Sequence, residues 1–121
     1  MRVEFIPEGS PHCPLLCLRD FDPGQVRALR ELLRELVAGA RPSVRVEEHL
    51  ELAGARMHFV SGDRDVGLEA AREGFRLVLT PLSWHNVEGL LEPFEAPHVD
   101  GYQWLDESGW IRLLISRDGS W

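Results

Sequence analysis

The stretch DPGQVRALRELLRELVAG, residues 22–39, is the clearest secondary-structure signal in the chain and decides how the rest is interpreted. Asp22 is a suitable N-cap, Pro23 suits the first helical position, and Gly39 suits the left-handed residue that follows a helix. Apolar residues recur at helical spacing, while arginines and glutamates fill the intervening positions. We therefore predict an amphipathic helix over about residues 23–38, with one face in a core that other elements must supply.

Short strands are predicted on both sides of this helix. Residues 2–6 and 15–21 are extended, apolar stretches separated by a turn-rich segment, and they predict a strand pair. Residues 43–80 show alternating apolar side chains and predict four strands in a meander. The expected breaks in this meander fall at Ala53-Gly54, residues 62–65 and Glu73-Gly74.

A second helix is predicted from Thr80-Pro81 to about residue 92, followed by a hairpin over residues 102–116 that turns near Ser108-Gly109. Neither a linker nor an internal repeat is visible, so residues 1–121 are expected to form a single globular domain. We predict an α+β fold in the order ββ-α-ββββ-α-ββ. It has one antiparallel sheet of about six to eight strands, with two helices packed on one face.

Composition restricts the classes of partner and chemistry. The chain has 20 acidic and 13 basic residues, a formal net charge of -7, and all its basic residues are arginine. Most of the excess negative charge lies in residues 62–121, which disfavours nucleic acid and anionic membranes as partners. The absence of lysine excludes a Schiff-base lysine and a P-loop lysine.

No apolar run approaches the roughly 20 residues needed to cross a bilayer, so no membrane partner is expected. Cys13 and Cys17 lie in an extended stretch, too far apart for a disulfide, and are predicted to be free thiols. Free thiols suit a reducing compartment, and we expect a cytoplasmic location.

The C-terminal hairpin carries the first candidate site. A two-residue turn at Ser108-Gly109 would place one mixed set of apolar and polar side chains on the face opposite Trp104 and Ile111. Either a helix of the same domain covers this face, or it binds another chain, because Trp and Arg are enriched at interfaces. The candidate binding residues are Leu105, Trp110, Arg112, Leu114 and Trp121.

The second candidate site is a pair of histidines. If Ala53-Gly54 is a two-residue turn, His49 lies opposite His58, with Glu47 on the same face. Two imidazoles and a carboxylate could supply three metal ligands or an acid–base pair. The alternative is two exposed histidines with no metal between them.

The sequence contains no phosphate-binding glycine motif and no nucleophile elbow, so no cofactor is expected. We favour a non-catalytic protein–protein interaction domain, of the kind found in immunity proteins, adaptors and other inhibitors or regulators. Its partner would be another protein or a second copy of the chain, giving a homodimer. The alternative is a small metal-dependent enzyme or ligand-binding domain that uses Glu47, His49 and His58.

Overall fold

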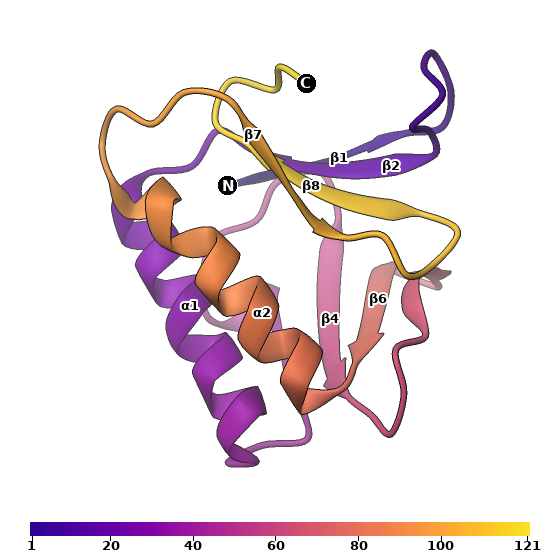
Figure 1. Ribbon diagram of the computed structural model, residues 1–121, viewed down its shortest axis with the longest axis vertical. Coiled ribbons are helices and arrows are strands. Elements are labelled where there is room, and N and C mark those ends of the chain that lie inside the picture. Colours follow the sequence, from indigo (N-terminus) through magenta and orange to yellow (C-terminus); the bar gives the residue numbers. More distant parts are fainter.

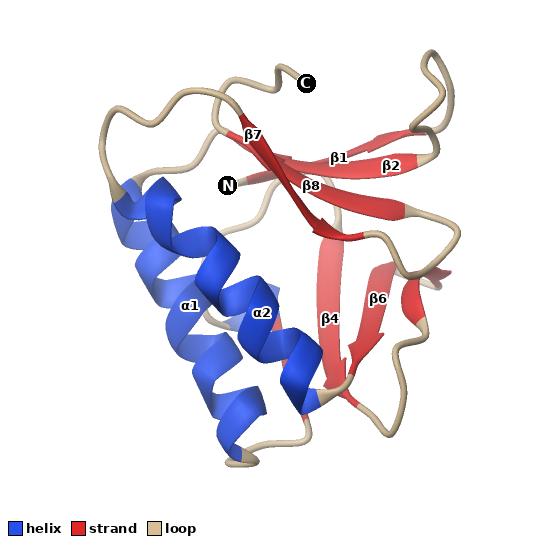
Figure 2. Cartoon of the chain, viewed as in Figure 1, coloured by secondary structure: helices blue, strands red, loops and turns tan.

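Two mixed β-sheets and a pair of packed helices make up the protein, as seen in a computed structural model that describes all residues 1–121 (Figures 1 and 2). The strands are β1 (Arg2–Ile6), β2 (Leu15–Arg19), β3 (Ser43–Arg45), β4 (Arg56–Ser61), β5 (Gly67–Ala71), β6 (Gly74–Leu79), β7 (Tyr102–Asp106) and β8 (Arg112–Ser116). The helices are α1 (Pro23–Ala38) and α2 (Pro81–Leu91), with short 3-10 turns at Val46–Glu48 and Glu92–Glu95. Neither α-helix is long and apolar enough to cross a membrane.

The α+β class is confirmed, but the expected single antiparallel sheet is wrong. The terminal sheet has the strand order β1-β2-β8-β7, and the central sheet has the order β3-β4-β6-β5. In each sheet the inner two strands are parallel and the outer pairs are antiparallel. The expected meander fails because β4 pairs with β6 and leaves β5 at the edge; alternating side chains report which face is buried, not which strands are neighbours.

The two halves of the chain share one topology. The first half runs β1-β2-α1-β3-β4 and the second runs β5-β6-α2-β7-β8. If each strand of the first half is exchanged for the corresponding strand of the second half, the strand order of the terminal sheet becomes that of the central sheet. The parallel pair β2–β8 then corresponds to the parallel pair β4–β6. This topological repeat has no visible counterpart in the sequence beyond the Asp22-Pro23 and Thr80-Pro81 helix starts.

The helices begin at side-chain caps and pack against each other (Figure 1). Asp22 accepts a 2.8 Å hydrogen bond from the Gln25 backbone N–H, and Gly39 ends α1 in the left-handed conformation with φ 75°, as predicted. Arg30 of α1 and Glu88 of α2 form a 2.9 Å ion pair between the helices, and both side chains are only 11% exposed. Each lies eight residues after its own N-cap, so the two occupy equivalent positions in the topological repeat.

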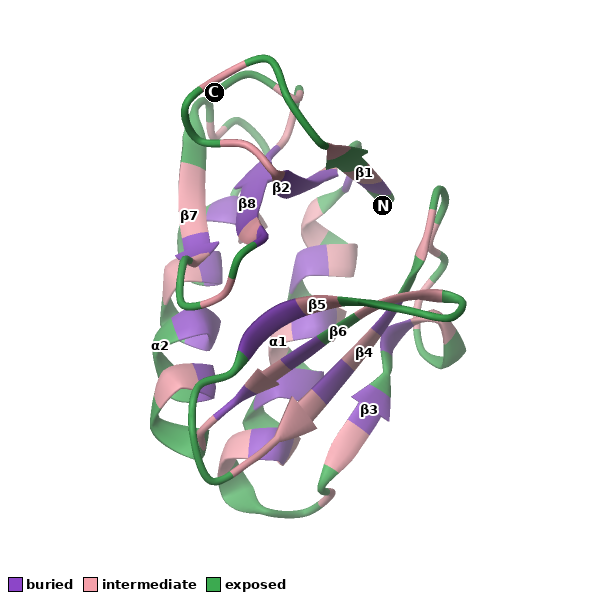
Figure 3. Ribbon diagram, turned by 90° about the vertical axis from the view of Figure 1, so that its right-hand side faces the viewer, coloured by how far each residue is buried: buried purple, intermediate pink, exposed green.

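The main core fills the space that the two sheets and the helices enclose (Figure 3). Trp84 of α2 is fully buried there, where its ring lies 4.9 Å from that of Phe59 and its Nε1 donates a 2.9 Å hydrogen bond to the carbonyl of Val60. A second, smaller cluster of Leu15, Cys17 and Leu114 is separate from this core. It lies on the other face of the terminal sheet, away from the helices.

The sheets meet at two close backbone contacts. The Val3 N–H donates to the carbonyl of Ala53 at 2.8 Å, and Leu68 is bridged to Ile111. Beside the second contact, a Cβ added to Gly67 would lie 2.4 Å from the backbone of Gly109, and Gly67 has a φ of 92°. Glycine is therefore required at Gly67, because only glycine permits both this φ and this approach.

Candidate functional surfaces

The candidate sites lie on the outer faces of the two sheets, which point away from the helices. The strand register aligns the middle residues of each sheet in a row across its outer face. In the terminal sheet this row is Glu4, Cys17, Leu114 and Trp104. In the central sheet the topologically equivalent row is Glu69, Arg76, His58 and Arg45.

Aromatic side chains gather on the outer face of the terminal sheet. The ring of Trp104 lies 5.5 Å from that of His12 and 6.3 Å from that of Tyr102, which is 51% exposed. Trp110, in the turn between β7 and β8, is 83% exposed. We call this surface the aromatic face and define it by His12, Tyr102, Trp104, Trp110, Arg112 and Trp121.

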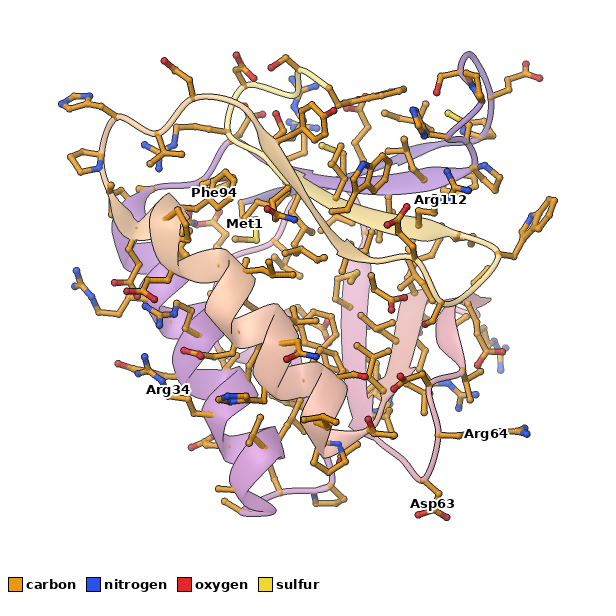
Figure 4. All side chains as sticks on the ribbon, viewed as in Figure 1. Met1, Arg34, Asp63, Arg64, Phe94 and Arg112 are labelled. Carbon is orange, nitrogen blue, oxygen red and sulfur yellow. The ribbon has the colours of Figure 1, made fainter.

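Two further residues complete the aromatic face. The Arg112 side chain extends from the outer side of β8, where its Nη1 lies 3.3 Å from Nδ1 of His12 (Figure 4). The chain after β8 folds back, because the Ser116 hydroxyl donates a 2.7 Å hydrogen bond to the carbonyl of Ser120. Trp121 directly follows Ser120 in the chain, so this bond brings the exposed C-terminal residue close to Ser116 at the end of β8.

The expected common face of the hairpin is wrong in part. A β-bulge between Trp104 and Asp106 shifts the register, so Trp104 pairs with Leu114 and Leu105 points into the main core. Leu114 does lie on the outer face, but it is fully buried. Trp104, which was expected on the opposite face, and Tyr102 are members of this surface, and no signal in the sequence marks the bulge.

The segment between β1 and β2, rather than a helix, covers part of this outer face. Cys13 in that segment packs on Leu15, Cys17 and Leu114, and the neighbouring His12 packs its ring at a tilt against Trp104. Burial, followed by the nearby Glu4 carboxylate, raises the pKa of the Cys17 thiol to about 11. Both cysteines are free, as predicted, and Cys17 is shielded as a core residue would be.

The outer face of the central sheet contains a hollow of about 540 Å³ that is rich in arginine. We call it the arginine hollow, and its lining comprises Arg45, Glu47, residues 56–58 and residues 69–76. Four arginines and three glutamates line it. The sequence analysis missed this site, because its residues come from separate segments that only the sheet register brings together.

The three carboxylates of the hollow are all engaged. Glu69 pairs with Arg76 at 3.3 Å, and Glu73 pairs with Arg56 at 2.8 Å. Glu47 accepts a 3.0 Å hydrogen bond from the backbone N–H of Met57. Two lining arginines, Arg45 and Arg72, form no ion pair.

His58 lies between two of these arginines. It pairs with Arg45 of β3 on one side and Arg76 of β6 on the other. Burial lowers the pKa of its imidazole, the two guanidinium groups lower it further, and Glu47 opposes them. The imidazole is therefore held in its neutral form at neutral pH.

The structure does not assemble Glu47, His49 and His58 into a metal site. Strand β3 ends at Arg45 and a 3-10 turn follows, so Arg45 rather than His49 lies opposite His58. His49 instead lines a separate hollow of about 240 Å³, with its Nε2 3.2 Å from Nη1 of Arg41. No group of three or more His, Cys, Asp or Glu side chains could hold a metal ion.

One partly buried carboxyl lies at the bulge of β7. Oδ1 of Asp106 accepts a 2.8 Å hydrogen bond from the Ser108 hydroxyl, whereas its Oδ2 has no partner. Burial raises the pKa of this carboxyl, and the hydrogen bonds from Ser108 only partly offset the effect. The ionised form is thus disfavoured in the folded protein.

Comparison with known proteins gives no family or relative from which a function could be transferred. No family model, no curated protein and no solved structure matches the chain. The function must therefore be argued from the chemistry of the aromatic face and the arginine hollow.

Proposed function

We propose that this chain is a non-catalytic protein-binding domain that engages a partner protein through its aromatic face. The observation that carries the proposal is the distribution of aromatic residues. Three of the four tryptophans and the single tyrosine belong to this face, while the remaining tryptophan, Trp84, is buried in the core. Trp110, with 83% of its surface exposed, is the most prominent of them.

Exposing large aromatic side chains to water is energetically unfavourable unless a partner protein covers them. A Trp or Tyr side chain buries roughly 150–250 Å² when it is fully covered, and this burial favours association. Trp, Tyr and Arg are the residue types that most often dominate binding energy at interfaces, and Arg112 accompanies the aromatic side chains here. Trp104 packs against the tilted ring of His12 and the edge of the Tyr102 ring, and side chains restrained by such contacts before binding lose less entropy when a partner binds.

The negative charge of the chain favours some kinds of partner protein over others. Residues 62–121, which include most of the aromatic face, hold most of the excess negative charge of the chain. A partner with a basic rim around an apolar centre would be attracted over a distance and held at short range. Stoichiometric binding of this kind is the mechanism expected of an inhibitor or adaptor.

The test uses two matched variants of exposed apolar residues. Trp110→Glu alters the aromatic face, and Leu82→Glu alters α2 at a side chain that is 72% exposed. Native mass spectrometry of the untagged chain first separates self-association from a heterologous partner. For a captured and purified partner, titration calorimetry should then show binding weakened at least about tenfold by Trp110→Glu, or about 1.4 kcal/mol.

Leu82→Glu should leave that affinity unchanged. Equal loss of binding in both variants, with the fold intact by circular dichroism, would show that the partner does not use the aromatic face. A dimer that Trp110→Glu converts to monomer would identify a second copy of the chain as the partner.

A further inference from the structure

We infer that the arginine hollow is a binding site for a small organic molecule bearing a phosphate or carboxylate group. This site is on the opposite sheet from the aromatic face, and the inference does not depend on the proposed protein partner. Phosphate and carboxylate groups would be recognised in the same way, as an oxyanion held by guanidinium groups.

The hollow has more arginines than glutamates, four against three, although the protein as a whole is acidic. The chain has a formal net charge of -7, yet four of its 13 arginines line this one hollow. Every lining carboxylate already accepts a hydrogen bond or an ion pair from the protein itself. Arg45 and Arg72 are left with unused donors, and Arg is the residue best suited to hold phosphate or carboxylate oxygens in pairs.

The hydrogen-bond donors of the hollow are aligned across neighbouring strands. Arg45, His58 and Arg76 lie side by side on β3, β4 and β6, and neighbouring strands are about 4.8 Å apart. Their side chains leave the same face of the sheet, so donors from adjacent strands can reach one oxyanion. The ion pair between Arg76 and Glu69 restrains one of these guanidinium groups before a ligand arrives.

The size of the hollow suits a small molecule rather than a single ion, since its volume of about 540 Å³ is in the range of small-molecule sites. Met57 and Phe75 also border the hollow, but they alternate with His58 and Arg76 along their strands and pack on the main core from the other face of the sheet. Apolar contact on the outer face is therefore supplied by Ala71 and the methylene stems of the arginines. Because guanidinium groups also stack on aromatic rings, the ligand should carry an aromatic portion next to its oxyanion.

The experiment measures binding of three probes by NMR titration of the full chain: inorganic phosphate, phenyl phosphate and benzoate. Chloride keeps the ionic strength constant. We expect saturable shifts of residues lining the hollow, with phenyl phosphate or benzoate binding more tightly than inorganic phosphate because guanidinium groups and their methylene stems can pack on the aromatic ring. The tighter of the two aromatic probes identifies whether a phosphate or a carboxylate is preferred.

The variants compare two exposed arginines that form no ion pair. Arg45→Gln removes a donor of the hollow, whereas Arg64→Gln removes the same charge from the β4–β5 connection, where Arg64 projects into solvent (Figure 4). Arg45→Gln should weaken phenyl phosphate binding at least about tenfold, and Arg64→Gln should change it less than about twofold. Equal effects of the two variants, or shifts that never saturate, would overturn the inference.

His58 supplies a readout that non-specific charge attraction would not reproduce. It faces Arg45 of β3, Arg76 of β6 and Glu47 of the 3-10 turn, with Glu69 of β5 at the end of the same row. A bound anion should raise the pKa of His58, so benzoate should bind more tightly as the pH falls below neutral. An unchanged His58 titration in saturating benzoate would contradict the site, while Trp110→Glu should leave probe binding intact.

Discussion

The outer faces of the two sheets present opposite chemistry at equivalent backbone positions. The middle row of the terminal sheet is Glu4, Cys17, Leu114 and Trp104, and that of the central sheet is Glu69, Arg76, His58 and Arg45. The connections explain the difference. Eight residues join β1 to β2 and fold over the terminal sheet, whereas only two residues join β5 to β6 and leave the central sheet open. The two sheets have the same topology, so the difference follows from the length of these loops. The long β1–β2 loop buries the outer face of the terminal sheet in a second cluster, whereas the short β5–β6 loop leaves the outer face of the central sheet in contact with solvent.

The largest expected effect comes from truncating the equivalent residues Leu114 and His58. Leu114→Ala should lower the free energy of unfolding by about 3 kcal/mol, since it opens a cavity in a fully buried cluster. His58→Ala should lower it by less than about 0.5 kcal/mol, because a partly exposed side chain leaves no cavity. Urea denaturation measures both, and similar losses would show that the two faces are not distinct.

A smaller effect is expected at the bulge of β7, which has no counterpart in β3. Asp106→Asn should raise the free energy of unfolding by about 1 kcal/mol at neutral pH, because it removes the charge from a partly buried carboxylate whose buried Oδ2 has no partner. The pKa of Asp106 is raised in the folded state, so its cost is absent well below the ordinary aspartate pKa and appears as the pH rises through the folded-state value. The gain should therefore vanish in acid, and a gain that persists there would have another origin.

The smallest changes in stability are expected for Glu4 and Glu69, which end the two outer-face rows and are the same residue type in both sheets. Glu4 pairs with Arg19 at 2.9 Å and Glu69 pairs with Arg76 at 3.3 Å; the first pair is partly exposed and the second is exposed. Glu4→Gln and Glu69→Gln should each change the free energy of unfolding by less than about 0.5 kcal/mol. Thermal unfolding at low and high salt measures them, and a large loss in only one variant would extend the difference between the faces to their rims.

The local parts of the fold could be predicted from the sequence. The bounds of α1 follow from Asp22, Pro23, the apolar periodicity and Gly39, all of which act within a few residues. Pairing between distant strands could not be predicted, because the alternation in β4 and β6 is the same for parallel and antiparallel neighbours.

The candidate sites show the same limit. Trp110 and Arg112 could be predicted as surface candidates from residue type, but Leu105 could not be placed without the bulge that turns it into the core. His49 failed as a partner of His58 because a 3-10 turn interrupts the expected strand. The arginine hollow could not be predicted from the sequence, because no short-range pattern links Arg45 to Arg76.

The division of strands between the two sheets also sets the order in which they can form. The central sheet lies entirely within residues 43–79, whereas the parallel pair of the terminal sheet joins Leu15 to Arg112, near the other end of the chain. Contacts between distant segments require more loop-closure entropy before they stabilise the chain. We therefore expect the central sheet to gain its native contacts early in folding, and the terminal sheet, with its aromatic face, to be completed last.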